Sequence, residues 1–122
     1  MLDALIVEDE KALQMLYTRL VEGSGYAVTV AGDGQEAITH LQSAGLPRLI
    51  LLDIRMPHSN GHDVLTYLQQ HPDVSKVHVV IVTASQEFSR YTNMVPSAEF
   101  VLKPMTPPVL KNIAHKCAQV TT

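Results

Sequence analysis

The sequence is poor in several kinds of residue, and each shortage disfavours a class of protein. Cys117 is the only cysteine, so an intramolecular disulfide is impossible and nothing favours an oxidising compartment. The 9 lysines and arginines are scattered and outnumbered by 12 acids, for a net charge of -3. Direct nucleic-acid binding is therefore disfavoured, because phosphate contacts need clustered basic side chains.

Signals for membranes and for common catalytic machinery are also missing. No apolar run approaches the roughly 20 residues that span a bilayer. The first apolar stretch is interrupted by Asp3 and by the acids at 8–10, and no basic leader precedes it, so a signal peptide is not predicted. The sequence contains no nucleophile elbow, zinc-ligand set or Walker loop. We expect a cytoplasmic protein that makes no direct contact with a membrane.

The length and composition fit one globular domain over residues 1–122, with 46% hydrophobic and 17% charged residues. Five short apolar runs alternate with helix-like segments. The runs are residues 2–7, 26–31, 49–52, 77–82 and 100–102. The helix-like segments are residues 12–20, 35–45, 64–68, 88–95 and 107–117. Most runs are continuously apolar, which is typical of strands covered on both faces.

Alternating strands and helices predict a parallel sheet with right-handed crossovers. We therefore expect an α/β fold, a flavodoxin-like three-layer αβα sandwich with a five-stranded parallel sheet of order 2-1-3-4-5. In that order the switch point lies between the first and third strands, and ligands bind at the carboxyl ends of the strands there.

Polar side chains stand at these carboxyl ends. Glu8 and Asp9 follow the first strand, Asp53 the third, Thr83 the fourth and Lys103 the fifth. Each one alone is weak evidence, because an acid at a strand end is more often a helix cap or a loop residue. Their combination at one edge of a sheet predicts a single converging site.

Three carboxylates in one crevice repel one another, and a divalent cation is the usual remedy. All-oxygen ligands favour Mg²⁺, or Mn²⁺, with Asp9 and Asp53 binding directly and Glu8 through water. If Asp53 attacks a phosphoryl group, the product is an aspartyl phosphate. The cation, the Lys103 ammonium and the Thr83 hydroxyl would then each neutralise one phosphoryl oxygen.

With these residues the chain resembles a response-regulator receiver domain of two-component phosphorelay systems, similar to the chemotaxis regulators. The matching segments are residues 5–10, 51–57 with Gly61, 82–84 and 100–104. The resemblance implies that Asp53 accepts a phosphoryl group from the phosphohistidine of a histidine kinase or phosphotransfer protein. It also implies that Glu8, Asp9, Asp53 and the backbone carbonyl of Arg55 bind Mg²⁺.

The same resemblance assigns switching roles. Thr83 would be the switch hydroxyl, Phe100 the switch aromatic and Lys103 the cation that contacts the phosphate. A downstream protein or output domain would bind the face formed by residues 88–95, the last strand and the last helix. The chain would be a phosphoacceptor that catalyses its own phosphotransfer and slow dephosphorylation, rather than an ordinary enzyme. A cis peptide bond is expected before Pro104.

Two features depart from the family pattern. The stretch between Thr83 and Lys103 is a residue or two shorter than usual, with Pro96, Ser97 and Ala98 where relatives often have a Gly-Ala turn. Phe100 lacks the hydroxyl of the more familiar tyrosine. The first departure concerns the partner surface more than the phosphate site, and without the hydroxyl an outward state of the Phe100 ring could not be fixed by that hydrogen bond.

Two other functions remain open from the sequence. A phosphorylation-independent adaptor with the same fold would signal through that face alone, although the intact acidic residues argue against it. Residues 32–37 read G-x-G-x-x-A after a strand, as in dinucleotide-binding proteins, but a tight turn before a helix explains them more simply. His58 and His62 are four residues apart, but Pro57 and Gly61 disfavour the helix that a zinc site would need.

Overall fold

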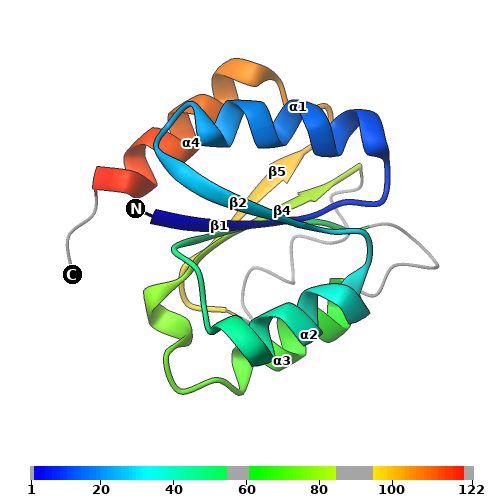
Figure 1. The fold of residues 1–122 in the computed structure, drawn as a ribbon, viewed down its shortest axis with the longest axis vertical. Coiled ribbons are helices and arrows are strands. Elements are labelled where there is room, and N and C mark those ends of the chain that lie inside the picture. Colours follow the sequence, from blue (N-terminus) through cyan, green and yellow to red (C-terminus); the bar gives the residue numbers. More distant parts are fainter. Residues whose placement is uncertain (1, 55–60, 85–94, 120–122) are drawn as a thin grey trace.

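A computed structural model describes residues 2–54, 61–84 and 95–119 of the chain. The predicted alternation of strands and helices is present in it (Figure 1). In chain order the elements are β1 (Leu2–Val7), α1 (Lys11–Glu22), β2 (Tyr26–Ala31), α2 (Gly34–Ala44), β3 (Leu49–Asp53), α3 (Gly61–Gln69), η1 (Val74–Lys76), β4 (His78–Thr83), β5 (Ala98–Leu102) and α4 (Pro107–Gln119).

All neighbouring strands pair in parallel, and their order is β2-β1-β3-β4-β5. This confirms the predicted sheet. Val7 pairs with Leu52 between β1 and β3, and Asp53 pairs with Val82 between β3 and β4. The register therefore brings the carboxyl ends of β1, β3 and β4 to one edge of the sheet.

The core consists of two layers because successive side chains of a strand point to opposite faces. In β1, Leu5 and Val7 pack on the side of α2 and α3, whereas Ala4 and Ile6 pack on the side of α1 and α4. Figure 1 shows these two helix pairs on opposite faces of the sheet. Strands β1, β3 and β4 have almost no exposed side chains, as their continuous apolar runs predict.

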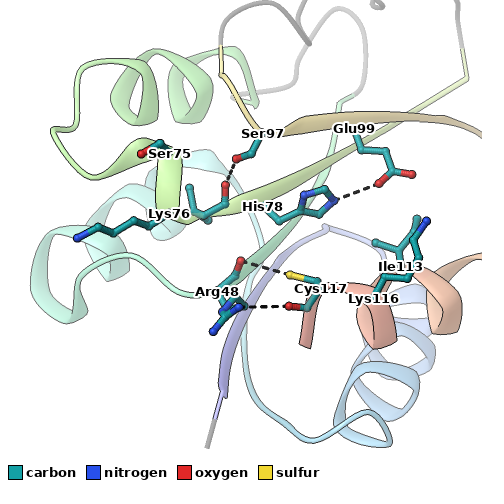
Figure 2. Close-up of a pocket in the computed structure, with 10 residues that line it drawn as sticks. Arg48, Ser75, Lys76, His78, Ser97, Glu99, Ile113, Lys116 and Cys117 are labelled. Carbon is teal, nitrogen blue, oxygen red and sulfur yellow. Dashed lines mark hydrogen bonds and ion pairs between the residues drawn. The ribbon is translucent and has the colours of Figure 1, made fainter. Parts of the chain in front are cut away.

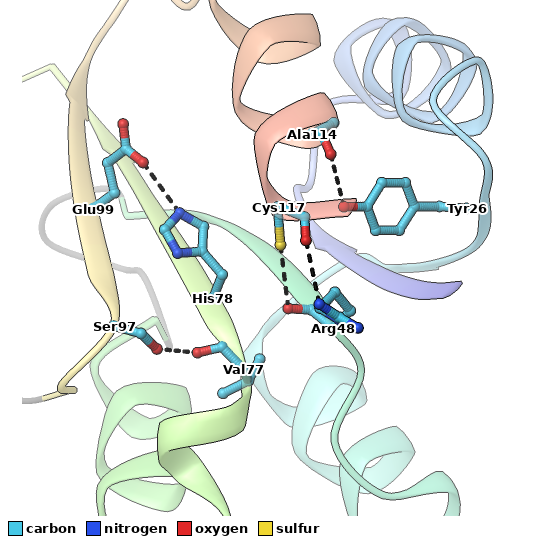
Figure 3. A network of polar contacts seen from close by, with 8 residues as sticks. All are labelled: Tyr26, Arg48, Val77, His78, Ser97, Glu99, Ala114 and Cys117. Carbon is cyan, nitrogen blue, oxygen red and sulfur yellow. Dashed lines mark hydrogen bonds and ion pairs between the residues drawn. The ribbon is translucent and has the colours of Figure 1, made fainter. Parts of the chain in front are cut away.

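The edge strand β2 is fixed to the last helix by a buried hydrogen bond. The Tyr26 hydroxyl donates to the backbone oxygen of Ala114 at 2.8 Å (Figure 3). Burial, followed by the contact with Cys117, raises the pKa of Tyr26 above its usual value. The phenol therefore remains a neutral donor at physiological pH.

Helix α2 begins where the glycine-rich segment suggested a nucleotide fingerprint. The Asp33 side chain accepts from the backbone amide of Glu36 at 2.9 Å, and the Glu36 carboxylate accepts from the amide of Gly32 at 2.8 Å. Two carboxylates thus take the amides that a pyrophosphate would need at this helix start. This disfavours the dinucleotide interpretation.

Several boundaries differ from the sequence predictions. The Val77 amide donates to the backbone oxygen of Val74, so Val77 ends the η1 turn. Strand β4 therefore starts at His78, one residue later than predicted. Strand β5 starts two residues earlier than predicted, at Ala98. On α1, Leu16 is 39% exposed although its spacing matched the apolar stripe.

The predicted helix over residues 88–95 lies outside the described residues except for Val95, which is buried. The helix labelled α4 is therefore the last helix that the sequence predicts, and its Leu110, Ile113, Ala114 and Cys117 are buried as expected. The peptide bond before Pro104 is cis, as predicted. None of the helices in the described part of the chain is both long enough and apolar enough to cross a membrane.

Candidate functional site

Three carboxylates meet at the switch point of the sheet. Glu8 follows β1 directly, Asp53 ends β3, and these two strands are neighbours. One carboxylate oxygen from each of Glu8, Asp9 and Asp53 lies within 4.8 Å of the others. Glu8 is only 2% exposed, and the Asp53 side chain only 5%, whereas Asp9 is exposed to solvent. The predicted acidic cluster is therefore present, with one face open to water.

Glu8 is held in place by the turn that follows it and by two elements, β2 and α1. Its Oε2 accepts from the backbone amides of Asp9 at 3.0 Å and Glu10 at 3.3 Å, next to the start of α1. Its own amide donates to the Ala31 oxygen at the end of β2. The Gln14 side chain, one turn into α1, donates to the Glu8 backbone oxygen.

The surroundings of Glu8 strongly favour its neutral form. Burial is the largest cause, followed by a hydrogen bond to Asp53 and the negative charge of Asp53, while the Glu10 amide opposes them. Together they raise the pKa of Glu8 from 4.5 to about 8. A divalent cation beside the cluster would reverse this preference, because it supplies the positive charge that the three carboxylates lack.

Lys103 brings a cation to Asp53 from the end of β5, two strands away in the sheet. Its Nζ lies 2.8 Å from Asp53 Oδ1, and its side chain is only 25% exposed. Because Lys103 follows β5 and Asp53 ends β3, the strand between them, β4, sets the distance that the lysine must reach across.

Thr83 ends that intervening strand and is 1% exposed. Its backbone oxygen accepts from the amide of Lys103 at 2.7 Å. The residue is thus fixed at the same edge of the sheet as Asp53, one position beyond Val82, with which Asp53 pairs.

Two further site residues were predicted from the sequence, Phe100 and Arg55. Phe100 lies on β5, half-buried against the core layer of α2 and α3. Arg55 lies outside the described residues.

Gln14 was missed by the sequence reasoning. Its signal was available: it stands one turn into the predicted first helix, on the side from which a side chain can return to the preceding strand end. The oxygen-only donor set of the cluster suits Mg²⁺ or Mn²⁺, as predicted.

Comparison with known proteins agrees with this geometry. The family model described as "Response regulator receiver domain" matches residues 4–115. The chain therefore belongs to the response regulator receiver domain family, whose members act in two-component signalling. It is a signalling phosphoacceptor by class, and the acidic cluster of Glu8, Asp9 and Asp53 fits the phosphorylation site. Membership of this class implies a histidine kinase as partner.

Among curated proteins, the chain is similar to the phosphate regulon transcriptional regulatory protein PhoB of Rhizobium meliloti. The two are 33% identical over 107 residues, which cover 86% of this chain and 47% of PhoB. The chain thus spans about half the length of that relative.

Among solved structures, a CheY-like receiver domain protein from Methanospirillum hungatei aligns with a TM-score of 0.79 and 25% identity, covering 98% of this chain and 95% of that one. The Mn²⁺-bound form of the response regulator Rcp1 aligns with a TM-score of 0.76 and 26% identity, covering 99% and 98%. Similarity over nearly the whole of both chains supports the same three-layer fold.

Proposed function

We propose that Asp53 accepts a phosphoryl group from the phosphohistidine of a histidine kinase or phosphotransfer protein, with a divalent cation bound. The observation that carries this proposal is the position of Asp53. Its carboxylate lies 2.8 Å from the Lys103 ammonium and within 4.8 Å of ligand oxygens from two other acids. This is the arrangement that an attacking carboxylate needs, because incoming phosphoryl oxygens meet positive charge on one side and a cation site on the other.

In the transfer, an Asp53 oxygen forms a bond to phosphorus while the bond from phosphorus to the imidazole nitrogen breaks, and its electron pair returns to the histidine. Lys103 stabilises one phosphoryl oxygen from the position it already occupies beside Asp53. The Thr83 hydroxyl would hydrogen-bond another; the burial of Thr83 at the same sheet edge supports this role.

Glu8, Asp9, Asp53 and the backbone carbonyl of Arg55 would hold Mg²⁺ or Mn²⁺. When bound, such a cation supplies positive charge to a third phosphoryl oxygen and to the carboxylates. Support comes from the oxygen-only cluster and from the receiver Rcp1, whose solved form contains Mn²⁺. The backbone contacts of Glu8 fix the position of one of these acids before any cation binds.

We further propose that Thr83 and Phe100 transmit the phosphorylated state. The receiving surface would be the face formed by residues 88–95, β5 and α4, which a downstream protein or output domain binds. The half-buried ring of Phe100 can change its packing at lower cost than a fully buried one, which suits a switch. This signalling would take place in the cytoplasm.

Phosphorylation is tested by intact-mass spectrometry after incubation with acetyl phosphate and Mg²⁺. The wild-type chain should gain the mass of one phosphoryl group, and Asp53→Ala should gain none. Asp3→Ala, which removes an exposed acid from the other end of β1, is the matched control and should behave as wild type. An unchanged wild-type mass with a competent donor, together with no Mg²⁺ affinity at millimolar concentration, would favour the adaptor function instead.

A further inference from the structure

A cavity lies at the opposite end of the sheet from Asp53. It opens beside the amino ends of β4 and β5 (Figure 2). Its volume is about 320 Å³. Its walls come from the turn before β3, from η1, β4 and β5, and from the last turns of α4. None of the acidic-cluster residues lines it, so it is separate from the proposed phosphorylation site.

Part of this cavity is apolar and buried. Val77, Ile113 and Cys117 are 1%, 4% and 6% exposed, and all three line it. A volume near 300 Å³ is at the lower end of the range for small-molecule sites. The occupant that fits is therefore a small molecule with an apolar body, about the size of one substituted ring.

Arg48 is held at the edge of the cavity by three elements. Its backbone amide donates to the Asp3 oxygen and its carbonyl accepts from the His78 amide, both at 2.9 Å. The Cys117 thiol also donates to that carbonyl at 3.7 Å, and Arg48 Nη1 donates to the Cys117 oxygen at 3.3 Å (Figure 3). Because the backbone of Arg48 and one of its guanidinium nitrogens are already held, the side chain loses little conformational entropy when it binds an anion.

The charge of the lining is positive, although the chain as a whole carries -3. Arg48, Lys76 and Lys116 line the cavity, and Glu99 is the only acid among its described lining residues. Glu99 is 3.1 Å from His78 Nε2, which holds its carboxylate against β4. The partner of Lys76, Asp73, is 3.6 Å away and both side chains are largely exposed, so that ion pair is weak.

We propose that this cavity binds a small organic oxyanion, a carboxylate or phosphate monoester on an apolar body. Arg48 binds the oxyanion, since a guanidinium matches the geometry of both groups. Lys116, on the other side of Cys117, adds positive charge to the lining (Figure 2). Val77, Ile113 and Cys117 contact the apolar body. The proposal does not depend on phosphorylation of Asp53.

An NMR titration of the full chain in metal-free buffer tests binding, with benzoate and phenyl phosphate as the probes. Amide shifts are expected at Val77, His78, Ile113 and Cys117. Benzamide has the shape of benzoate without its charge, and it should bind roughly two- to fivefold more weakly. Equal affinity for benzamide, or shifts confined to the acidic cluster, would overturn the proposal. A response to phenyl phosphate alone narrows the class to phosphate monoesters, and a response to benzoate alone narrows it to carboxylates.

Two lysines of α4 provide a matched pair of variants. Lys116 lines the cavity, whereas Lys111 does not, and both side chains are exposed. Lys116→Gln should weaken benzoate binding by roughly two- to fivefold, and Lys111→Gln should leave it unchanged. Equal effects of the two substitutions would show only general attraction to a basic helix and would refute the site.

Discussion

Glu8 is the least exposed of the three clustered acids, and its burial makes the stability of the chain depend on pH. In the folded chain its pKa is raised from 4.5 to about 8, chiefly by burial. Between those two values the folded state keeps a proton that the unfolded state has lost. Glu8 therefore contributes full stability below about pH 4.5, and this contribution is lost as pH rises through 8.

We expect the metal-free chain to lose stability between pH 5.5 and 8 by at most about 1.4 kcal/mol per pH unit from this group. Glu8→Gln keeps the size and polarity of the side chain but does not titrate, so its unfolding free energy should change less with pH. Urea unfolding of both chains in EDTA at several pH values measures the difference. Identical pH profiles would contradict the raised pKa.

Lys103 is the described cation nearest to Asp53, at 2.8 Å. Replacing it with methionine keeps much of the side-chain volume but leaves the carboxylates without that charge. We expect Lys103→Met to lower the metal-free unfolding free energy by about 1–3 kcal/mol and to slow phosphorylation. Lys111→Met, at an exposed position on α4, should do neither. Urea denaturation and timed mass spectra with acetyl phosphate check both effects. Phosphorylation of Lys103→Met at the wild-type rate would show that Lys103 has no part in the mechanism.

At the scale of elements, two helices end at glycines that differ in the sign of φ. Gly45 follows α2 with φ of 83°, a region that side chains rarely adopt, although nothing would contact an added Cβ. Gly23 follows α1 with an ordinary φ of -62°, and a Cβ there would meet Arg19 oxygen at 3.4 Å. Gly45→Ala should cost about 1–3 kcal/mol through strain alone, whereas Gly23→Ala should be close to neutral. Thermal unfolding compares them, and equal losses would refute the conformational explanation.

β1 and β2 were both predicted residue for residue, although Asp3 in β1 and several residues of β2 are exposed. The residues that follow or flank their apolar runs, Glu8 after β1 and Gly25 and Gly32 around β2, mark the ends of these strands. β5 was predicted short because its first residues, Ala98 and Glu99, lie at the sheet edge and are only partly buried. Leu16 was assigned to the apolar stripe of α1, but the width of that stripe depends on how α1 packs on the sheet, which periodicity does not specify.

For the functional site, the positions of the residues could be predicted from the sequence, but most of their contacts could not. Topology alone brings Glu8, Asp9, Asp53, Thr83 and Lys103 to one edge, since all follow or end parallel strands. The position of Gln14, one turn into α1, was a usable signal for its contact with Glu8. The pairing of His78 with Glu99 depends on side-chain reach and could not be predicted from spacing. The raised pKa of Glu8 likewise depends on burial and on its distance from Asp53, which are properties of the folded chain.

At the scale of the whole molecule, cation binding should be linked to folding. The cluster forms only when β1 and β3 pair, so the unfolded chain offers no equivalent site. At one hundred times the dissociation constant, Mg²⁺ should add about 2.7 kcal/mol to the unfolding free energy. Thermal unfolding at pH 7.5 in Mg²⁺ and in EDTA measures this, and Asp9→Asn should reduce the gain. A melting temperature that Mg²⁺ does not change would show that the cluster binds no cation.

The hydrogen bond from the Lys103 amide to the Thr83 oxygen has a practical consequence. The two residues proposed to sense the phosphate share one backbone link, so that link opens only if their segments separate. Deuterium uptake at the single amide of Lys103 should therefore report on both residues at once. If the switch moves only side chains, phosphorylation will leave this exchange rate unchanged; if it parts the two segments, this amide will exchange faster.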